Sequence, residues 1–193
     1  MSEQAASRTF APASLPYAIS YGNQFTTFTV SAERDAPDFY EGTSTGYVNR
    51  YMSIQMQEDL WVFPGSEARR LDELFVFGSY KRQTDAGIFE TTEVFENGPR
   101  LAVGQRYVAG FVLGQGDKLD LIGPEMVFRV ESGRLVADSR HGPESRAFDG
   151  MTIAEFQRRL NLATPLPAVL PYLNVLEGDK RLSLSRGDGA LPR

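Results

Sequence analysis

MVFRVESGRLVADS, residues 126–139, is the stretch that decides the fold class of this 193-residue chain. It contains two runs of alternating apolar and polar residues on either side of Ser132 and Gly133. Alternation with a period of two indicates a strand with one buried face, and a Ser-Gly pair between two such runs is typical of a tight turn. The stretch therefore predicts a β-hairpin.

Runs of the same kind precede this hairpin. They are rich in aromatic and β-branched residues, which suit a pleated, half-buried surface, and the chain holds 13 Phe and 8 Tyr. Turn-forming residues separate them at intervals of roughly 8–12 residues, which is typical of a small barrel or sandwich and not of an alternating α/β fold. The predicted strands are residues 24–33, 47–57, 60–63, 74–82, 88–95, 106–114 and 118–123.

One clear helix is predicted, over residues 151–161. Thr152 and Glu155 have the spacing of a capping box, in which each side chain satisfies a backbone N–H of the first turn. Apolar residues follow at helical spacing on one stripe. Two other segments have two interpretations each. Residues 66–74 are either a short helix or a loop, and residues 181–185 are either a last edge strand or part of a tail.

Residues 100–160 carry three motifs that resemble a known group of proteins. The motifs are LAVGQRYVAGFVLG at 101–114, MVFRVESGRLV at 126–136 and FDGMTIAEFQRRL at 148–160. This part of the chain resembles the C-terminal half of small, uncharacterised bacterial β-barrel proteins, which commonly carry export signals and are similar to OB-like barrels. The resemblance implies a barrel and brings no catalytic residues with it.

Pattern and resemblance together predict a mostly-β protein: a small closed or partly open, OB-like β-barrel with one packed C-terminal helix. We expect a single β-rich domain over residues 17–163. A flexible N-terminal tail, residues 1–16, precedes it, and a Pro-rich C-terminal extension, residues 164–193, follows it.

The composition excludes several chemistries. The chain has no Cys, so disulfides, thiolate nucleophiles and Cys-ligated metals are excluded. The net charge of −5 argues against a nucleic-acid partner, because such binding depends on neutralising phosphates. We expect no transmembrane segment, since no apolar run approaches the roughly 20 residues of a membrane helix. As written, the chain is expected in the cytoplasm. Its polar, small-residue start also resembles a mature exported protein to which Met1 has been added.

His141 is the weak catalytic candidate, because it is the chain's single His and any Ser–His–Asp machinery must include it. It lies in the turn-rich segment DSRHGPESR, for which a solvated loop is the simpler interpretation. Paired carboxylates are a second possible machinery, with surface hydration as the simpler interpretation. The candidate pairs are Glu93 with Glu96, Asp117 with Asp120, and Glu131 with Asp138. No metal pattern or phosphate-binding loop is present, so we expect neither a metal nor another cofactor.

Aromatic residues supply the binding candidates. Phe39 and Tyr40 lie in a long predicted loop, residues 35–46, and long loops on rigid scaffolds often carry function. Tyr51, Trp61 and Arg82 lie on predicted strands, where aromatic and basic residues interleave as on the binding face of an OB-like barrel. The simpler interpretation is that these aromatics belong to the core.

These observations favour a non-enzymatic binding or protein-interaction module whose partner is a protein or a small ligand. One alternative is a hydrolase or lyase that uses carboxylates and Arg, with His141 as acid or base. A further alternative is a single-stranded nucleic-acid binder.

Overall fold

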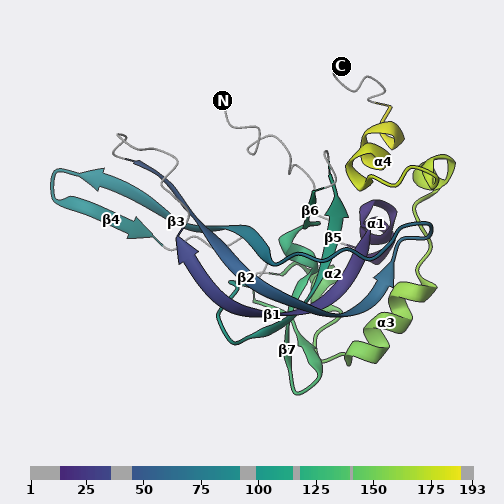
Figure 1. Ribbon diagram of the computed structural model, residues 1–193, viewed down its shortest axis with the longest axis horizontal. Coiled ribbons are helices and arrows are strands. Elements are labelled where there is room, and N and C mark those ends of the chain that lie inside the picture. Colours follow the sequence, from purple (N-terminus) through teal and green to yellow (C-terminus); the bar gives the residue numbers. More distant parts are fainter. Residues whose placement is uncertain (1–13, 36–44, 92–98, 115–117, 140, 188–193) are drawn as a thin grey trace.

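The computed structural model describes residues 14–35, 45–91, 99–114, 118–139 and 141–187. Within these residues the protein is mostly β, as expected (Figure 1). The strands are β1 (Gln24–Asp35), β2 (Thr45–Val62), β3 (Glu73–Thr84), β4 (Gly87–Thr91), β5 (Arg106–Leu113), β6 (Leu119–Leu121), β7 (Val127–Glu131) and β8 (Arg134–Val136). The helices are α1 (Leu15–Tyr21), α2 (Pro143–Arg146), α3 (Ile153–Leu162) and α4 (Gly178–Ser185), with short 3-10 turns η2 (Pro124–Met126) and η3 (Pro167–Tyr172).

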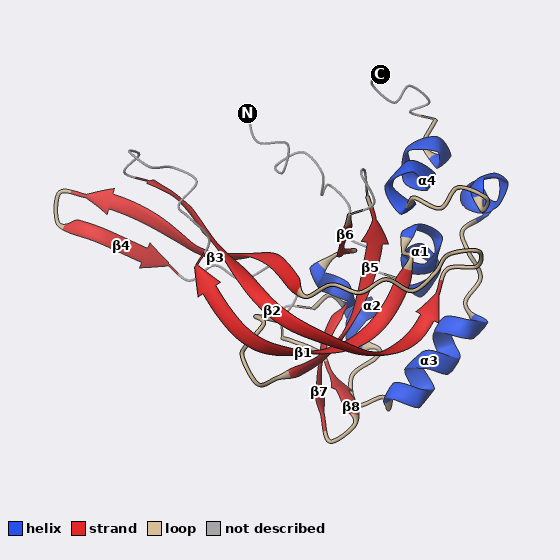
Figure 2. Ribbon diagram, viewed as in Figure 1, coloured by secondary structure: helices blue, strands red, loops and turns tan. Residues whose placement is uncertain are grey.

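All strands belong to one antiparallel sheet, in the order β4-β3-β2-β1-β5-β7-β8, with β6 paired to the far end of β5. The two ends of this order, β4 and β8, do not pair with each other in the described part of the chain. The sheet curls but stays open (Figure 2). The closed form of the expected barrel is therefore wrong.

Apolar side chains cover both faces of the sheet, because alternate residues of its central strand point to opposite sides. In β5, Val108 belongs to a cluster with α1 and α3, whereas Tyr107 belongs to a cluster inside the curl of the sheet. Phe25 packs edge-on against Phe156 of α3, with ring centroids 5.8 Å apart. On the opposite face Phe28 stacks on Tyr107 at 5.5 Å. The body is thus a two-sided core around β1 and β5.

The predicted hairpin is confirmed. β7 and β8 pair on either side of Ser132 and Gly133, which have φ values of 48° and 76°. Two successive residues with positive φ are what a tight hairpin turn of the mirror-image type requires, and Gly adopts this conformation without steric cost.

The predicted helix is confirmed as α3, including its capping box. The Thr152 hydroxyl accepts a hydrogen bond from the Glu155 N–H, and the Glu155 carboxylate accepts one from the Thr152 N–H. Phe156 and Leu160 are the buried residues of this helix.

The strands at 47–57 and 60–63 were predicted as two, but they are one. β2 runs through both for 18 residues, and its register against β1 shifts between residues 53 and 54 and twice between residues 56 and 61. The loop interpretation of residues 66–74 fits the structure, since no helix forms before β3 begins at Glu73.

Two helices near the ends of the described chain, α1 and α4, were not predicted from the sequence. α1 begins at Leu15, and residues 181–185 lie in helix α4, so the edge-strand interpretation of that segment is wrong. Arg181 of α4 is buried against the rest of the protein. Its side chain is fully buried and donates hydrogen bonds to the carbonyls of Ser20, Gly22, Val175 and Leu176. The C-terminal extension is thereby fastened to α1 and to the start of β1.

No helix in the described ranges is long and apolar enough to cross a membrane.

Candidate binding surface: the β2–β3–β4 arm

A three-stranded arm projects from the body of the molecule (Figure 1). β2 has 18 residues, which corresponds to about 60 Å of extended chain, far longer than an ordinary strand. Within the described residues, β1 pairs with β2 as far as Asp35 opposite Arg50. Beyond that point, residues 45–49 of β2 continue together with β3 and β4. We call residues 45–49 of β2, the paired residues 77–84 of β3, and β4 the arm, and the neighbourhood of Arg50 its root.

The arm's outer strand is set by a two-residue turn. Asp85 and Ala86 connect β3 to β4, and Thr84 pairs with Gly87, whose φ is 128°. In an antiparallel hairpin the closing pair is hydrogen-bonded, and the pairs then alternate between bonded and unbonded. The backbone groups of Ile88 and Glu90 consequently point away from β3.

β4 forms one open edge of the sheet. Among the described strands it pairs only with β3. Native proteins commonly protect such an edge with Lys, Pro or a bulge, and the β4 sequence, GIFET, contains neither Lys nor Pro. In the described part of the chain, no second strand therefore pairs with the outward side of β4.

Tyr51, one of the predicted binding residues, lies near the root of the arm. The Arg34 guanidinium sits 4.0 Å from the centre of its ring, and the Phe75 ring lies 5.1 Å away. Arg34 also donates two hydrogen bonds to the Glu73 carboxylate. Tyr51 is half-buried in a cross-strand ladder over β1, β2 and β3.

The structure does not bring the predicted aromatic–basic residues together. Trp61 contacts Phe25 and Phe63 in the body, with ring centroids 6.3 and 6.2 Å away. It lies ten residues from Tyr51 on the same strand, about 30 Å along it. Arg82 lies in the arm, opposite Thr45 and Phe89 in register. Phe39 and Tyr40 fall outside the described residues.

His141 is buried, with 2% of its surface exposed, so its expected position in a solvated loop is wrong. Its Nδ1 accepts a hydrogen bond from the Asp138 N–H, and its Nε2 lies 3.3 Å from the Pro124 carbonyl oxygen, to which the neutral ring can donate. Its ring packs against Phe128. These contacts stabilise the segment that leads from β8 to α2, and an acid–base role would require breaking them.

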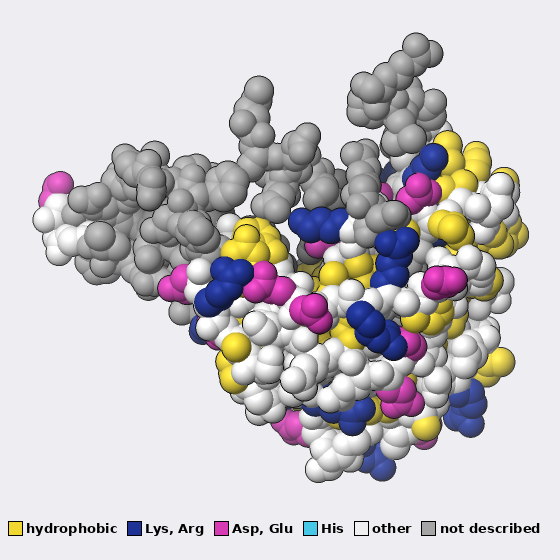
Figure 3. Space-filling model, in the orientation of Figure 1, with side chains coloured by type: hydrophobic (Ala, Val, Ile, Leu, Met, Phe, Trp, Pro, Cys, Tyr) yellow, Lys and Arg dark blue, Asp and Glu magenta, His cyan; other side chains and the backbone are white. Residues whose placement is uncertain are grey.

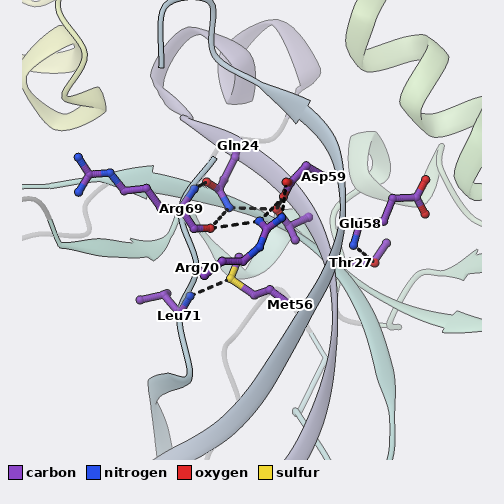
Figure 4. Close-up of polar contacts among 9 residues, drawn as sticks. Gln24, Thr27, Met56, Glu58, Asp59, Arg69, Arg70 and Leu71 are labelled. Atoms are coloured by element: carbon purple, nitrogen blue, oxygen red, sulfur yellow. Dashed lines mark hydrogen bonds and ion pairs between the residues drawn. The ribbon is translucent and has the colours of Figure 1, made fainter. Parts of the chain in front are cut away.

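A polar cluster lies under the segment that connects β2 to β3 (Figure 4). Gln24 is buried and bonds Arg69 twice, accepting from its N–H and donating to its carbonyl oxygen. Asp59 accepts a hydrogen bond from the Thr26 hydroxyl and two from the Arg70 guanidinium. Chiefly through the Arg70 hydrogen bond, the pKa of Asp59 is lowered, with burial opposing the shift. These groups satisfy one another, so the cluster holds the connection in place.

Acidic residues in the described part of the chain do not form a metal centre, since no group of three potential ligands gathers there. Glu131, one of the predicted carboxylates, is exposed and paired with Arg129 at 2.7 Å. Asp120 lies on β6 and Asp138 follows β8, whereas Glu93, Glu96 and Asp117 fall outside the described residues.

Exposed apolar side chains occur around the C-terminal helices (Figure 3). Leu162, Leu170 and Leu176 are the largest of them, between 43% and 76% exposed. They come from three different segments. Scattered surface leucines of this kind are normal and do not by themselves mark a docking site.

No protein-family model matches this chain, and no curated protein matches its sequence. The resemblance of residues 100–160 to small bacterial β-barrel proteins therefore stays a prediction.

Proposed function

We propose that this protein is a non-enzymatic protein-interaction module that binds an extended segment of a partner polypeptide along β4. The observation that carries the proposal is the open edge of the arm, where β4 has no strand partner beyond β3 in the described residues. Strand addition to such an edge gives affinity through main-chain hydrogen bonds. A predicted cytoplasmic or exported location is compatible with this role.

The shape of the molecule supports the same proposal. The body has an apolar core on both faces of the sheet, whereas the arm projects away from that core (Figure 2). Two- or three-stranded ribbons outside a core gain stability when another strand or surface covers them. A partner strand on β4 would supply that stabilisation.

We also propose the partly open, OB-like form of the barrel for the body. Its support is the curl of the sheet, which places Met52, Leu74 and Val127 from β2, β3 and β7 in one cluster. In this arrangement the arm, which includes β4, extends the wall of the barrel.

The test uses the full chain as bait for a displayed library of random linear 12-residue peptides. We expect selected peptides to shift the backbone amide resonances of residues 87–91 in NMR spectra. They should bind Glu90→Pro roughly tenfold more weakly than Glu90→Ala, because only the proline removes the outward N–H. The alanine variant is the matched control, since it loses the same side chain.

Two results would contradict the proposal. One is a peptide set that binds Glu90→Pro and Glu90→Ala equally well. The other is a failure to select any peptide together with a concentration-dependent dimer that Glu90→Pro abolishes, since β4 would then pair with a second copy of this chain. Sedimentation of the unliganded protein measures the dimer.

A further inference from the structure

A buried arginine lies at the root of the arm. Arg50 of β2 lies opposite Asp35 of β1. Its side chain is only 5% exposed and makes an ion pair with Glu33. Its Nε is buried and has no hydrogen-bond partner within the described structure. A guanidinium has five donors, so this arginine retains capacity for a further acceptor.

Two more arginines approach the same place. Arg100 Nη2 lies 3.9 Å from the Glu33 carboxylate, and Arg129 lies opposite Tyr107 in the pairing of β7 with β5. Their side chains are 46% and 44% exposed. Burial raises the pKa of the Tyr107 phenol, and the hydrogen bond from Ala102 and, to a smaller extent, the positive charges of Arg129 and Arg50 oppose that rise. Both charges therefore act on one phenol, at the end of the inner face of the sheet.

Tyr107 holds the loop that carries Arg100. Its hydroxyl donates to the Arg100 carbonyl and accepts a hydrogen bond from the Ala102 N–H. Since the phenol is 1% exposed, this loop is fixed to a buried group and not to a surface side chain. Arg100 is thus presented at a defined position beside Arg50.

The carboxylates near these three arginines in the described residues are Glu33, Glu131 and Asp35, which lies opposite Arg50 in the pairing of β1 with β2. Glu33 forms ion pairs with both Arg50 and Arg100, and its side chain is 31% exposed. A carboxylate of the protein itself therefore occupies the position where an external one would bind.

We propose that Arg50, Arg100 and Arg129 form a binding site for a small oxyanion, a carboxylate or a phosphate, with Glu33 as the internal group that the ligand displaces. Guanidinium groups bind both kinds of oxyanion through paired, charge-assisted hydrogen bonds. The site is separate from the β4 edge and does not depend on a partner polypeptide.

The experiment measures binding of sodium phosphate and of sodium acetate to the full chain by NMR titration, with sodium chloride at matched ionic strength. We expect saturable shifts at residues 50, 100 and 129 with at least one of the two anions. Arg129→Met and Arg100→Met should each weaken binding about tenfold, the value of a lost charge-assisted pair. Glu33→Gln should strengthen it, because the competing carboxylate is gone.

Arg158→Met, an exposed arginine of α3, is the matched control and should bind as the unaltered protein does. The preferred anion distinguishes a carboxylate ligand from a phosphate ligand. Shifts equal to those with chloride, or affinity unchanged in Arg100→Met and Arg129→Met, would overturn the inference. Glu90→Pro should leave anion binding unaltered, so failure of this site and failure of the β4 proposal are distinguishable.

Discussion

Replacing Arg181 by Met tests how the C-terminal extension is held. The side chain makes four hydrogen bonds of 2.7–2.9 Å to carbonyl oxygens, and its guanidinium lies 3.7 Å from the centre of the Phe63 ring. Leu176 keeps another donor, the Asn23 amide, at 2.7 Å. The substitution therefore leaves three carbonyls without this donor, while the Met side chain retains much of the apolar volume.

The expected loss in the free energy of unfolding is the balance of opposing contributions. The buried carbonyls of Ser20 and Gly22 and the part-buried carbonyl of Val175 each lose a donor at about 1–2 kcal/mol, and the lost contact with Phe63 costs about 1 kcal/mol more. Against this, burial lowers the pKa of Arg181 to about 10, with Glu177 opposing the shift, so the charged group itself is costly to bury. We expect a net loss of about 2–4 kcal/mol in the free energy of unfolding, or roughly 6–12 °C in Tm for a chain of this size.

Thermal and urea unfolding measure this loss, and Lys180→Met is the matched control in the same helix. We expect the control to change stability by less than about 0.5 kcal/mol, because Lys180 is only partly buried. Equal stability of the two variants would refute the reasoning, since the four hydrogen bonds would then contribute no more than the cost of burying the charge.

Three further predictions concern the body. Gly178→Ala should destabilise the protein by about 3 kcal/mol or more, because its Cβ would lie 1.8 Å from the Tyr21 carbonyl oxygen, whereas Gly142→Ala, with nothing within 4 Å, should be nearly neutral in the same unfolding assay. Thr152→Ala should cost about 1 kcal/mol through loss of the α3 cap, and an effect no larger than that of the exposed Thr164→Ala would count against the cap. Because the folded pKa of Asp59 lies below its ordinary value of 3.8, the Arg70 ion pair stabilises the protein above that pH and is lost as the pH falls through the folded pKa. The stability difference between the unaltered protein and Asp59→Asn should therefore shrink on acidification, and a difference independent of pH would contradict this account.

Local patterns predicted the elements whose causes are local. The hairpin at Ser132 and Gly133 and the capped helix α3 depend on residues within a few positions of one another, and both are confirmed. α4 differs, because Arg181 is anchored by Ser20 and Gly22, about 160 residues earlier in the chain. A charged residue in a short segment resembles a solvated tail until its distant acceptors are known.

The candidate sites were also harder to predict, because they depend on how residues far apart in the sequence are brought together. Tyr51 and Trp61 interleave with basic residues in the sequence, yet they lie far apart because β2 is extended and its register against β1 shifts. Arg50 interrupts an apolar face of β2, and that interruption was the one signal that a charge lies among buried residues. Whether a strand is at an open edge depends on the whole sheet, so no local pattern identifies β4 as one.

Two carboxyl groups of the described residues have pKa values shifted away from the range that a general acid needs. A carboxyl group that acts as a general acid near neutral pH needs a raised pKa. The pKa values of two described carboxyls, Asp59 and Glu155, are both lowered, chiefly by hydrogen bonds from Arg70 and from Thr152. Other carboxylates, Glu33 among them, are paired with arginines. Neither Asp59 nor Glu155 has the raised pKa of a general acid, and the proposed anion site depends instead on the arginines that lie beside Glu33.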